Sequence, residues 1–365
     1  MTHLSDLVQL LARPRHGYDR PVRALFCIPE LALNGAVTSL LEQVRHMRAQ
    51  SDSITVLTPQ LIGPARALMT AFQETGAEVV HTANSGQHDV AVGCTVYSAR
   101  YLQLLVERMP TVWWIHEGRL GLNTMLGRPE NIETLTRVGK LIFPSWGAVE
   151  RLWSPLLGNL PPGRIEVIPP RVPRPAPGPA MTRGTGLSRI VCVGTLYRRK
   201  RQVDLIRAVA ALHGAAIQCV LIGEGDQFDE PADKIVAANP ERFVLTGGLQ
   251  PDDVQAWYRS SDIFCLPSED ECMPIAPIEA AWHELPVVLA DLACYEGVWH
   301  HGFNALIHPV GDYEMLAWYL RMLIESASLR ARFAKAGGAL ALRFDGQRFG
   351  TMFDSVLQEA IATFC

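Results

Sequence analysis

Two glutamates, Glu271 and Glu279, flank a seven-residue stretch that carries no other charge. The stretch follows an apolar run at 263–266 that is typical of a buried strand. Pro277 suits the first turn of a helix, because its missing N–H costs nothing there. We therefore expect the carboxylates to bind opposite ends of one ligand, while the backbone N–H groups between them bind its anionic middle. The alternative is that Glu279 complements the helix dipole and Glu271 is solvated.

A pair of cations forms the second candidate site. Arg199 and Lys200 come shortly after Gly194, which follows an expected strand at 189–193, and they precede an expected helix. A helix N-terminus with adjacent cationic side chains is a suitable site for a phosphate group. The alternative is a basic run that is solvated at a domain surface. Gly223 follows the next expected strand, in a short glycine turn of a kind that many such loops contain.

The first half of the chain holds two further candidates. Gly35 lies between an expected strand and an expected helix, and a glycine there lets a ligand approach the backbone closely. His116 follows the apolar strand expected at 111–115, which places it at the carboxyl end of that strand. The alternatives are an ordinary turn at Gly35 and a structural role for His116.

Composition excludes several classes of protein. A length of 365 residues suggests about two domains, and 48% apolar with 19% charged residues excludes global disorder. The formal charge is −4, divided as about +2 for residues 1–172 and about −6 for the rest. This mild asymmetry does not predict a nucleic-acid-binding protein, which would carry a basic stripe.

Cysteine usage and hydropathy predict a cytoplasmic protein. The eight cysteines form no CxxC pair, and several lie inside apolar runs, as expected for reduced thiols rather than for a disulfide framework or a zinc site. The N-terminal residues lack the pattern of a signal peptide, and no apolar run approaches 18 residues. Nothing in the sequence therefore predicts a segment that spans a membrane.

Strands alternate with helices along the chain, which predicts an α/β protein with two doubly wound parallel sheets. The first domain is expected over 1–172, a linker rich in proline and glycine over 173–187, and the second domain over 188–345. A terminal helix over 346–365 is expected to pack back on the first domain. Ligands in open α/β folds bind at the carboxyl ends of the strands, so all the candidate residues border the cleft expected between the sheets.

Individual elements follow from apolar periodicity. Strands are expected at 23–28, 54–57, 78–81, 89–93, 111–115, 141–144, 165–168, 189–193, 217–222, 242–245, 262–266 and 287–289. Helices are expected at 4–11, 36–48, 64–75, 102–109, 203–212, 251–259, 277–283, 314–325, 329–341 and 346–364.

Together these segments resemble the retaining glycosyltransferases of the GT-B type, with two Rossmann-like domains, and specifically their family 4. Residues 193–200, VGTLYRRK, resemble that family's VGTLxxRKN segment, and residues 271–280 resemble its E-x7-E motif. The remaining matching segments are 34–36, which resembles the GGA loop, 114–117, a strand that ends in His, and 286–288, 302–306 and 309–312. The resemblance covers nearly the whole chain and is densest from about 190 to 325.

The resemblance implies a reaction and its substrates. A nucleotide-diphosphate sugar is the donor, no metal or further cofactor is used, and the sugar passes to an acceptor hydroxyl with retention at the anomeric carbon. The acceptor is a glycan, a lipid-linked glycan or a small molecule. Many relatives act on lipid-linked acceptors, which leaves peripheral contact with the inner membrane open for a first domain of only about +2.

Residue roles follow from the same resemblance. Arg199 and Lys200 bind the diphosphate, Glu279 binds the ribose hydroxyls, and Glu271 binds the sugar hydroxyls near the reacting carbon. His116 lies near the sugar. The remaining donor-binding positions are the backbone at Met273, Pro274, Ile275 and Ala276, with Gly35, Gly194 and Gly223 bordering the donor.

The sequence departs from the family pattern in three places. Asn34 replaces the first glycine of the GGA loop, Pro170-Arg171 replaces an Asn-Gly pair before the linker, and Arg201 stands where Asn or Gly is usual. The acidic run at 269–271 also resembles the metal-binding triplet of the other glycosyltransferase fold. Because the cation pair already supplies positive charge, we do not favour a metal site there.

Other functions on the same architecture remain open. A nucleotide-sugar epimerase would use the same donor cleft without an acceptor, and a non-catalytic protein would bind the nucleotide sugar only. An intact E-x7-E motif and an intact cation pair favour the transferase over both. A dinucleotide oxidoreductase is disfavoured, because no GxGxxG follows the first strand. Retention itself has two routes: Glu271 as a covalent nucleophile, or attack by the acceptor on the face of the leaving group, which the resemblance favours.

Overall fold

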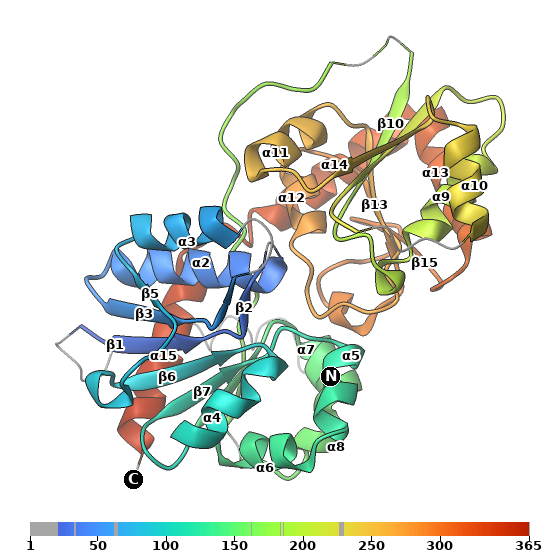
Figure 1. Ribbon diagram of the computed structural model, residues 1–365. Helices are drawn as coiled ribbons and strands as arrows, with labels where there is room; N and C mark the ends of the chain where they lie inside the picture. The colour runs from blue at the N-terminus through green and yellow to red at the C-terminus, as the bar shows by residue number, and fades with distance from the viewer. Residues whose placement is uncertain are drawn as a thin grey trace.

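The computed structural model describes residues 21–364, except 33, 62–64, 162, 183, 185 and 226–229. The described chain forms two α/β units, each built on a parallel sheet, that lie one above the other in Figure 1. The predicted fold class is confirmed: both sheets are doubly wound and carry helices on both faces. The helix expected at 4–11 lies outside the described residues.

The first sheet has seven strands in the order β5-β3-β1-β6-β7-β8-β9. The strands are β1 (Arg23–Cys27), β3 (Ser53–Leu57), β5 (Glu78–Val80), β6 (Val90–Cys94), β7 (Thr111–Trp114), β8 (Lys140–Phe143) and β9 (Ile165–Val167), and a separate pair is formed by β2 (Glu30–Leu31) and β4 (Gln60–Leu61). The helices are α2 (Gly35–Arg48), α3 (Ala65–Glu74), α4 (Ala99–Leu105), α5 (Arg119–Leu126), α6 (Pro129–Arg137), α7 (Trp146–Ala148) and α8 (Ser154–Leu157).

The second sheet has six strands in the order β12-β11-β10-β13-β14-β15. The strands are β10 (Ser188–Val193), β11 (Ile217–Ile222), β12 (Phe243–Gly247), β13 (Ile263–Leu266), β14 (Val287–Ala290) and β15 (Leu306–His308). The helices that follow β10 are α9 (Gln202–Ala210), α10 (Glu230–Ala238), α11 (Pro251–Arg259), α12 (Ala276–Trp282), α13 (Tyr313–Glu325), α14 (Ala327–Ala341) and α15 (Arg348–Thr363).

The strand order reverses once in each sheet. Successive strands extend outward from β1 on one side and from β6 on the other, and in the second sheet the same reversal lies between β10 and β13. Crossovers on either side of such a point leave opposite faces of the sheet, which opens a crevice at the carboxyl ends of the two central strands. The segments after these central strands are therefore the ones best placed to bind a ligand.

Several elements differ from the sequence expectations. The helix expected at 102–109 is α4, which begins and ends earlier, because the chain turns before Pro110 to enter β7. The elements that were not predicted are α5, α6, α7, α8, α10, β2, β4 and β15. The shortest of them, the strands and the helices α7 and α8, carry too few residues for a periodic apolar pattern to stand out.

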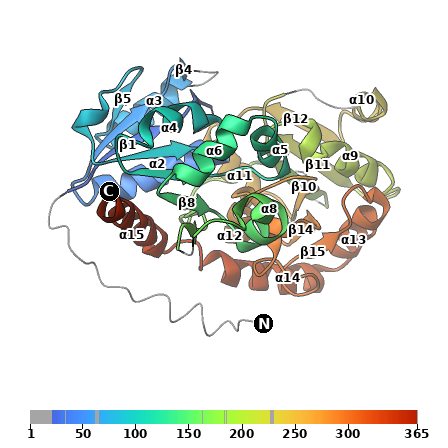
Figure 2. The ribbon, with the colours of Figure 1, turned by 90° about the horizontal axis from the view of Figure 1, so that it is seen from below.

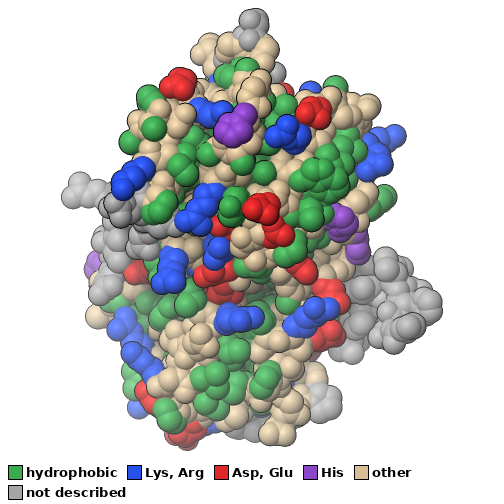
Figure 3. Space-filling model, turned by 90° about the vertical axis from the view of Figure 1, so that its right-hand side faces the viewer, with side chains coloured by type: hydrophobic (Ala, Val, Ile, Leu, Met, Phe, Trp, Pro, Cys, Tyr) green, Lys and Arg blue, Asp and Glu red, His purple; other side chains and the backbone are tan. Residues whose placement is uncertain are grey.

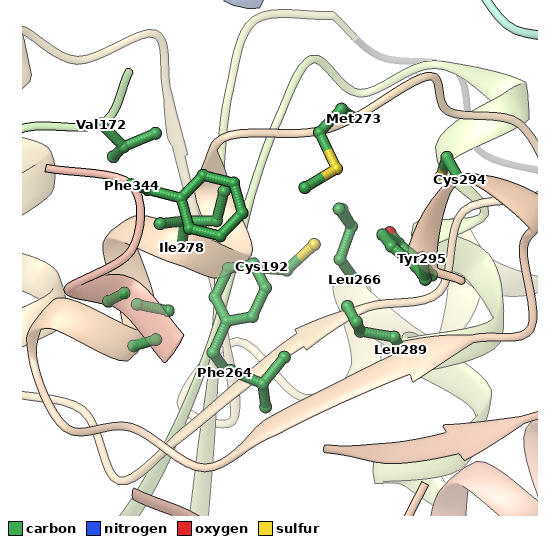
Figure 4. Packing of buried hydrophobic residues seen from close by; sticks show 14 of the residues in the cluster. Val172, Cys192, Phe264, Leu266, Met273, Ile278, Leu289, Cys294, Tyr295 and Phe344 are labelled. Carbon is green, nitrogen blue, oxygen red and sulfur yellow. The ribbon is translucent and has the colours of Figure 1, made fainter. Parts of the chain in front are cut away.

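The core of the second domain lies directly beneath the candidate site. Figure 4 shows Met273, from the loop before α12, pointing toward Leu266 of β13, with Tyr295 beside Leu266 and Leu289. All these side chains are buried. The loop that carries the candidate residues is thus anchored by its apolar members. Every cysteine that the structure describes is a buried free thiol.

The last helix returns to the first sheet. Helix α15 lies beside the first domain in Figure 2, while α13 and α14 cover the second. The Phe353 ring lies 4.8 Å from the Trp114 ring, and Lys140 Nζ donates to Glu359 at 2.6 Å. Just before the linker, Arg171 donates to Glu42 of α2 at 3.1 Å. The chain passes between the domains twice, at the linker and before α15, and near both passages it is held to the first domain.

Candidate active site

Glu271 and the cation pair meet at the reversal point of the second sheet. Lys200 follows β10 and Glu271 follows β13, and these strands are neighbours. The Glu271 carboxylate accepts from Lys200 Nζ at 2.5 Å, from Ser268 Oγ at 2.7 Å and from Arg199 at 3.3 Å. Burial alone would raise the pKa of Glu271, but the charges of Lys200 and Arg199 outweigh it and the pKa is lowered. Glu271 is therefore a fixed carboxylate at neutral pH.

Glu279 is in a different environment. It lies in the first turn of α12, where Tyr258 of α11 donates to its Oε2 at 3.3 Å. Burial raises the pKa of Glu279 to about 7, although the Tyr258 hydrogen bond opposes the shift. With no cation close enough to pair with it in the described residues, Glu279 is poised between its acid and its carboxylate at neutral pH.

The loop between the two glutamates presents free backbone donors. Met273 is buried, whereas Pro274, Ile275 and Ala276 are half-buried. Among the described residues, none accepts a hydrogen bond from the backbone N–H groups of Met273, Ile275 or Ala276. Ala276 begins α12, so these donors lie at the positive end of that helix dipole. The arrangement suits an anion held between the two carboxylates.

Two glycine turns bring the loops after β10 and β11 together. Gly194 has φ +152° and Gly223 has φ +155°. A Cβ atom on Gly223 would lie 2.2 Å from the carbonyl oxygen of Gly194, a distance that real Cβ contacts do not reach. This close approach requires glycine at 223 and sets the position of the backbone that leads to Lys200.

Gly223→Ala is expected to lower the free energy of unfolding by about 3 kcal/mol or more, because backbone strain and steric overlap add at this position. Gly214→Ala is the matched control, since Gly214 also has a positive φ, +76°, but a Cβ there meets no atom of the described chain within 4 Å. The control should lose only about 1–2 kcal/mol. Denaturant unfolding of both variants measures the difference, and equal losses would contradict the steric argument.

His116 and Glu117 directly follow the carboxyl end of β7. The His116 ring lies 4.4 Å from the Trp114 ring, and its buried Nε2 has no hydrogen-bond partner among the described residues. Burial lowers the pKa of His116 to about 3, so the imidazole is neutral. Glu117 accepts from the backbone N–H groups of Val96 and His116, both at 3.0 Å. These bonds fix the segment that carries His116.

Glu117 was not among the residues singled out from the sequence. Burial raises the pKa of Glu117 to about 7, with backbone hydrogen bonds from Val96 and His116 opposing the shift. The signal that would have found it is its position directly after His116 at the end of a buried strand.

Gly35 is the first residue of α2, and Asn34 is its N-cap. The Asn34 side chain accepts from the N–H of Val37 at 3.0 Å. Asn34, which replaces the first glycine of the family's GGA loop, thus accepts from one of the backbone N–H groups at the start of α2. A Cβ atom on Gly35 would meet nothing within 4 Å, so no described group requires glycine there.

The three acidic residues at 269–271 have three different partners. Glu269 pairs with Arg201 at 3.0 Å, Asp270 accepts from the backbone of α5, and Glu271 binds the cation pair. Among residues 21–364, apart from the gaps named above, no group of three or more His, Cys, Asp or Glu side chains could hold a metal ion. Arg201 has φ +50° in the left-handed region, which explains why Asn or Gly is usual at its position in the family pattern.

Charged side chains of both signs lie along the boundary between the two domains on the face shown in Figure 3.

Of the site residues predicted from the sequence, the structure brings Arg199, Lys200 and Glu271 into direct contact and places Glu279 at the other end of one loop. His116 and Gly35 belong to the opposite domain, at the carboxyl ends of its strands.

Comparison with known proteins gives a consistent result. Residues 183–339 match the sequence model described as "Glycosyl transferases group 1". A sulfoquinovosyl transferase from Arabidopsis thaliana is 32% identical over 149 residues, which are 40% of this chain and 28% of that protein. An alpha-galactosylglucosyldiacylglycerol synthase from Streptococcus pneumoniae is 30% identical over 32% of each chain. The matched part spans about a third of the length of these relatives.

Solved structures match the whole fold. HepE from Anabaena, solved with UDP and glucose, has a TM-score of 0.76 at 17% identity, over 92% of this chain and 99% of that one. Sucrose-phosphate synthase from Thermosynechococcus elongatus has a TM-score of 0.73 at 13% identity, over 93% and 99%. The chain therefore has the two-domain GT-B fold, and its second domain matches the group 1 glycosyl transferases.

Proposed function

We propose that this chain is a retaining glycosyltransferase that moves a sugar from a nucleotide-diphosphate sugar to an acceptor hydroxyl without a metal ion. The contact of Lys200 and Arg199 with Glu271 carries the proposal, together with the backbone N–H groups of Met273, Ile275 and Ala276, which have no acceptor among the described residues. The match of residues 183–339 to the group 1 glycosyl transferases supports it.

The site suits the charge changes of such a transfer. Breaking the sugar–phosphate bond leaves a diphosphate with growing negative charge, which fixed cations and N–H dipoles in a buried site stabilise. Arg199, Lys200 and the start of α12 would supply them. Glu271, held as a carboxylate, would accept hydrogen bonds from the sugar hydroxyls, and Glu279 would accept from the ribose hydroxyls.

Retention is proposed to occur by attack on the face of the leaving group. Both oxygens of Glu271 already accept hydrogen bonds from cationic or hydroxyl groups, and its pKa is lowered. Each of these bonds withdraws electron density from the carboxylate, so it would be a poor covalent nucleophile. The acceptor would instead enter beside the departing phosphate, whose oxygen takes its proton. Neutral His116, whose Nε2 has no hydrogen-bond partner among the described residues, would bind a hydroxyl of the sugar.

The acceptor is proposed to be a glycan, a lipid-linked glycan or a small molecule. Relatives named for transfer to lipid and to a small molecule, 2-deoxystreptamine, are both among the matches, so they do not narrow this choice. Within the part of the chain that the structure describes, no helix combines the length and apolarity needed to cross a membrane. Cytoplasmic location and peripheral membrane contact stay predictions.

The alternative function, a nucleotide-sugar epimerase, is not favoured. An assay for free epimerised nucleotide sugar would reveal that activity.

Calorimetric titration with UDP, GDP, TDP and ADP in the presence of EDTA tests the proposal. We expect one diphosphate to bind, with UDP first in order because HepE, of similar fold, was solved with UDP. The matching nucleotide sugar should then release its diphosphate on incubation, and product stereochemistry should show retention. Failure of all four to bind, with or without magnesium, would remove the donor site and with it this function.

Nucleotide affinity is expected to fall by about tenfold between pH 8 and pH 6. The pKa of Glu279 is raised to about 7, so its carboxylate, the form that accepts two ribose hydrogen bonds, becomes the minor form below that pH. Affinity falls in proportion to the binding-competent fraction, which is about one tenth one pH unit below the pKa. Calorimetry across this range measures the trend.

Glu279→Gln is the control for this pH dependence, because the amide does not titrate. The variant should retain only the dependence that arises from the phosphates of the nucleotide. An identical pH profile in the wild type and the variant would exclude Glu279 as the titrating group.

A further inference from the structure

Asp270 links the two domains at the centre of the candidate site. Asp270 is only 8% exposed, and its carboxylate accepts from the backbone N–H groups of Arg119 at 2.7 Å and Leu120 at 2.9 Å, which are the first two residues of α5. Its own carbonyl oxygen accepts from the Arg199 guanidinium at 2.7 Å. One residue of the second domain therefore contacts both a proposed phosphate-binding cation and a helix of the first domain. Hydrogen bonds from a helix N-terminus to a carboxylate are charge-assisted and favoured by the helix dipole.

The first domain is shaped to receive this carboxylate. A Cβ atom on Gly118 would lie 2.1 Å from Asp270 Oδ1 and 2.8 Å from the carbonyl oxygen of Glu271. Gly118 has φ −87° and ψ −134°, a combination outside the regions that residues with a side chain prefer. Both this backbone conformation and the approach of the other domain therefore favour glycine here.

Other contacts between the domains lie further along the sheet edge. Ser145 donates to the carbonyl oxygen of Cys272 at 3.1 Å, and a Cβ atom on Gly147 would lie 1.8 Å from the carbonyl oxygen of Ala293. These residues follow β8, whereas Gly118 follows β7, directly after His116 and Glu117. The Asp270 contact differs from these two, because it joins the segment that carries His116 to the residue next to Glu271.

We propose that Asp270 is a positioning residue for the transfer: it holds the His116 segment of the first domain against the donor site of the second. This inference rests on the proposed function. Groups that act on one sugar from two domains need a fixed separation, and a displacement of about 1 Å can cost about 10²-fold in rate. Asp270 supplies that constraint without touching the donor, because its carboxylate is fully engaged by α5.

The test compares Asp270→Asn with Glu269→Gln. The first variant keeps the size of the side chain but turns one of its acceptor oxygens into an NH₂ group that faces a backbone N–H. The second removes the neighbouring charge, whose partner Arg201 belongs to the same domain. Three quantities are measured for each: hydrogen exchange of the amides of Arg119 and Leu120, the Kd for UDP, and kcat and KM for release of UDP from UDP-glucose. If the first titration identifies another base, its diphosphate and sugar nucleotide replace these probes.

Asp270→Asn is expected to speed exchange at these two amides by about tenfold or more, to lower kcat by about 10–100-fold and to leave the Kd for the diphosphate within about threefold of wild type. Glu269→Gln should change none of the three. A merely structural role would move stability without this split between kcat and Kd. Unchanged exchange in Asp270→Asn, or a Kd that worsens as much as kcat falls, would overturn the inference.

Gly118→Ala provides a second approach to the same contact from the opposite domain, and it serves if Asp270→Asn does not fold. It should show the same faster exchange and the same loss of kcat at constant Kd. Failure of the proposed function is distinguishable, because a wild-type protein that neither binds nor turns over any nucleotide sugar refutes the catalytic role directly. The exchange measurement then decides by itself whether Asp270 joins the domains.

Discussion

Lys200→Ala is expected to lower nucleotide-sugar turnover by about 10²–10³-fold, the effect typical of removing one preorganised group that stabilises developing charge. The Lys200 side chain is 12% exposed and its Nζ lies 2.5 Å from Glu271. The variant loses the cation proposed to face the diphosphate, so diphosphate affinity should fall as well. Turnover and calorimetric Kd measure both effects.

The same substitution should destabilise the fold. It leaves Glu271 buried with only Arg199, at 3.3 Å, as a cationic partner, and removing one member of a buried ion pair typically costs about 3–5 kcal/mol. The sign of the pH dependence follows: Glu271 has a lowered pKa in the wild type, so its stabilising contribution is present at neutral pH and is lost as pH falls through that pKa. Lys200→Ala should weaken this acid sensitivity.

Lys335→Ala is the matched control, because Lys335 is an exposed residue of α14 in the same domain. It should leave turnover, Kd and stability close to wild type. The double variant Lys200→Ala with Glu271→Gln should recover part of the stability, since the unpaired buried charge is gone, but none of the activity. Turnover of Lys200→Ala within about threefold of wild type would contradict the assignment of Lys200 to the donor site.

Glu271→Gln is expected to lower turnover by about 10²-fold or more while diphosphate affinity is retained or improved. The two effects separate because Glu271 has two roles. It holds Lys200 and Arg199 in place, and it is proposed to accept hydrogen bonds from the donor sugar. An uncharged side chain of the same shape no longer competes with phosphate for the cations, but it binds sugar hydroxyls less strongly.

Steady-state turnover and calorimetry with the diphosphate alone measure these two effects. Glu269→Gln serves again as the control, because it removes a charge two residues away without touching the cation pair. A loss of diphosphate binding equal to the loss of turnover would contradict the proposed division of roles. Recovery of turnover by added azide, with an inverted product, would instead identify Glu271 as a covalent nucleophile.

The sequence by itself determined the fold class and most of the candidate positions. Alternating strands and helices require parallel sheets, and parallel sheets place the segments after the strands at one edge. A short loop and the first turn of α12 separate Glu271 from Glu279. The two glutamates therefore lie on either side of the loop N–H groups that have no acceptor among the described residues. These are local properties of the chain.

Only the tertiary structure decided which of these segments meet. Lys200 and Glu271 are 71 residues apart and touch because β10 and β13 are neighbours in the sheet. Asp270 reaches Arg119, 151 residues away, because the domains close on each other there. No local pattern encodes such contacts.

Burial was also decided by the tertiary structure. The raised pKa of Glu279 and the lowered pKa of His116 both have burial as their largest cause, and burial depends on what the rest of the chain places around a side chain. The short helix α5, which the sequence did not predict, has its first two N–H groups satisfied by Asp270 of the other domain, a contact that stabilises the start of the helix. Local propensity and spacing thus determined the elements and the edge of the sheet, while packing between elements distant in the chain determined the contacts, the charges and the site.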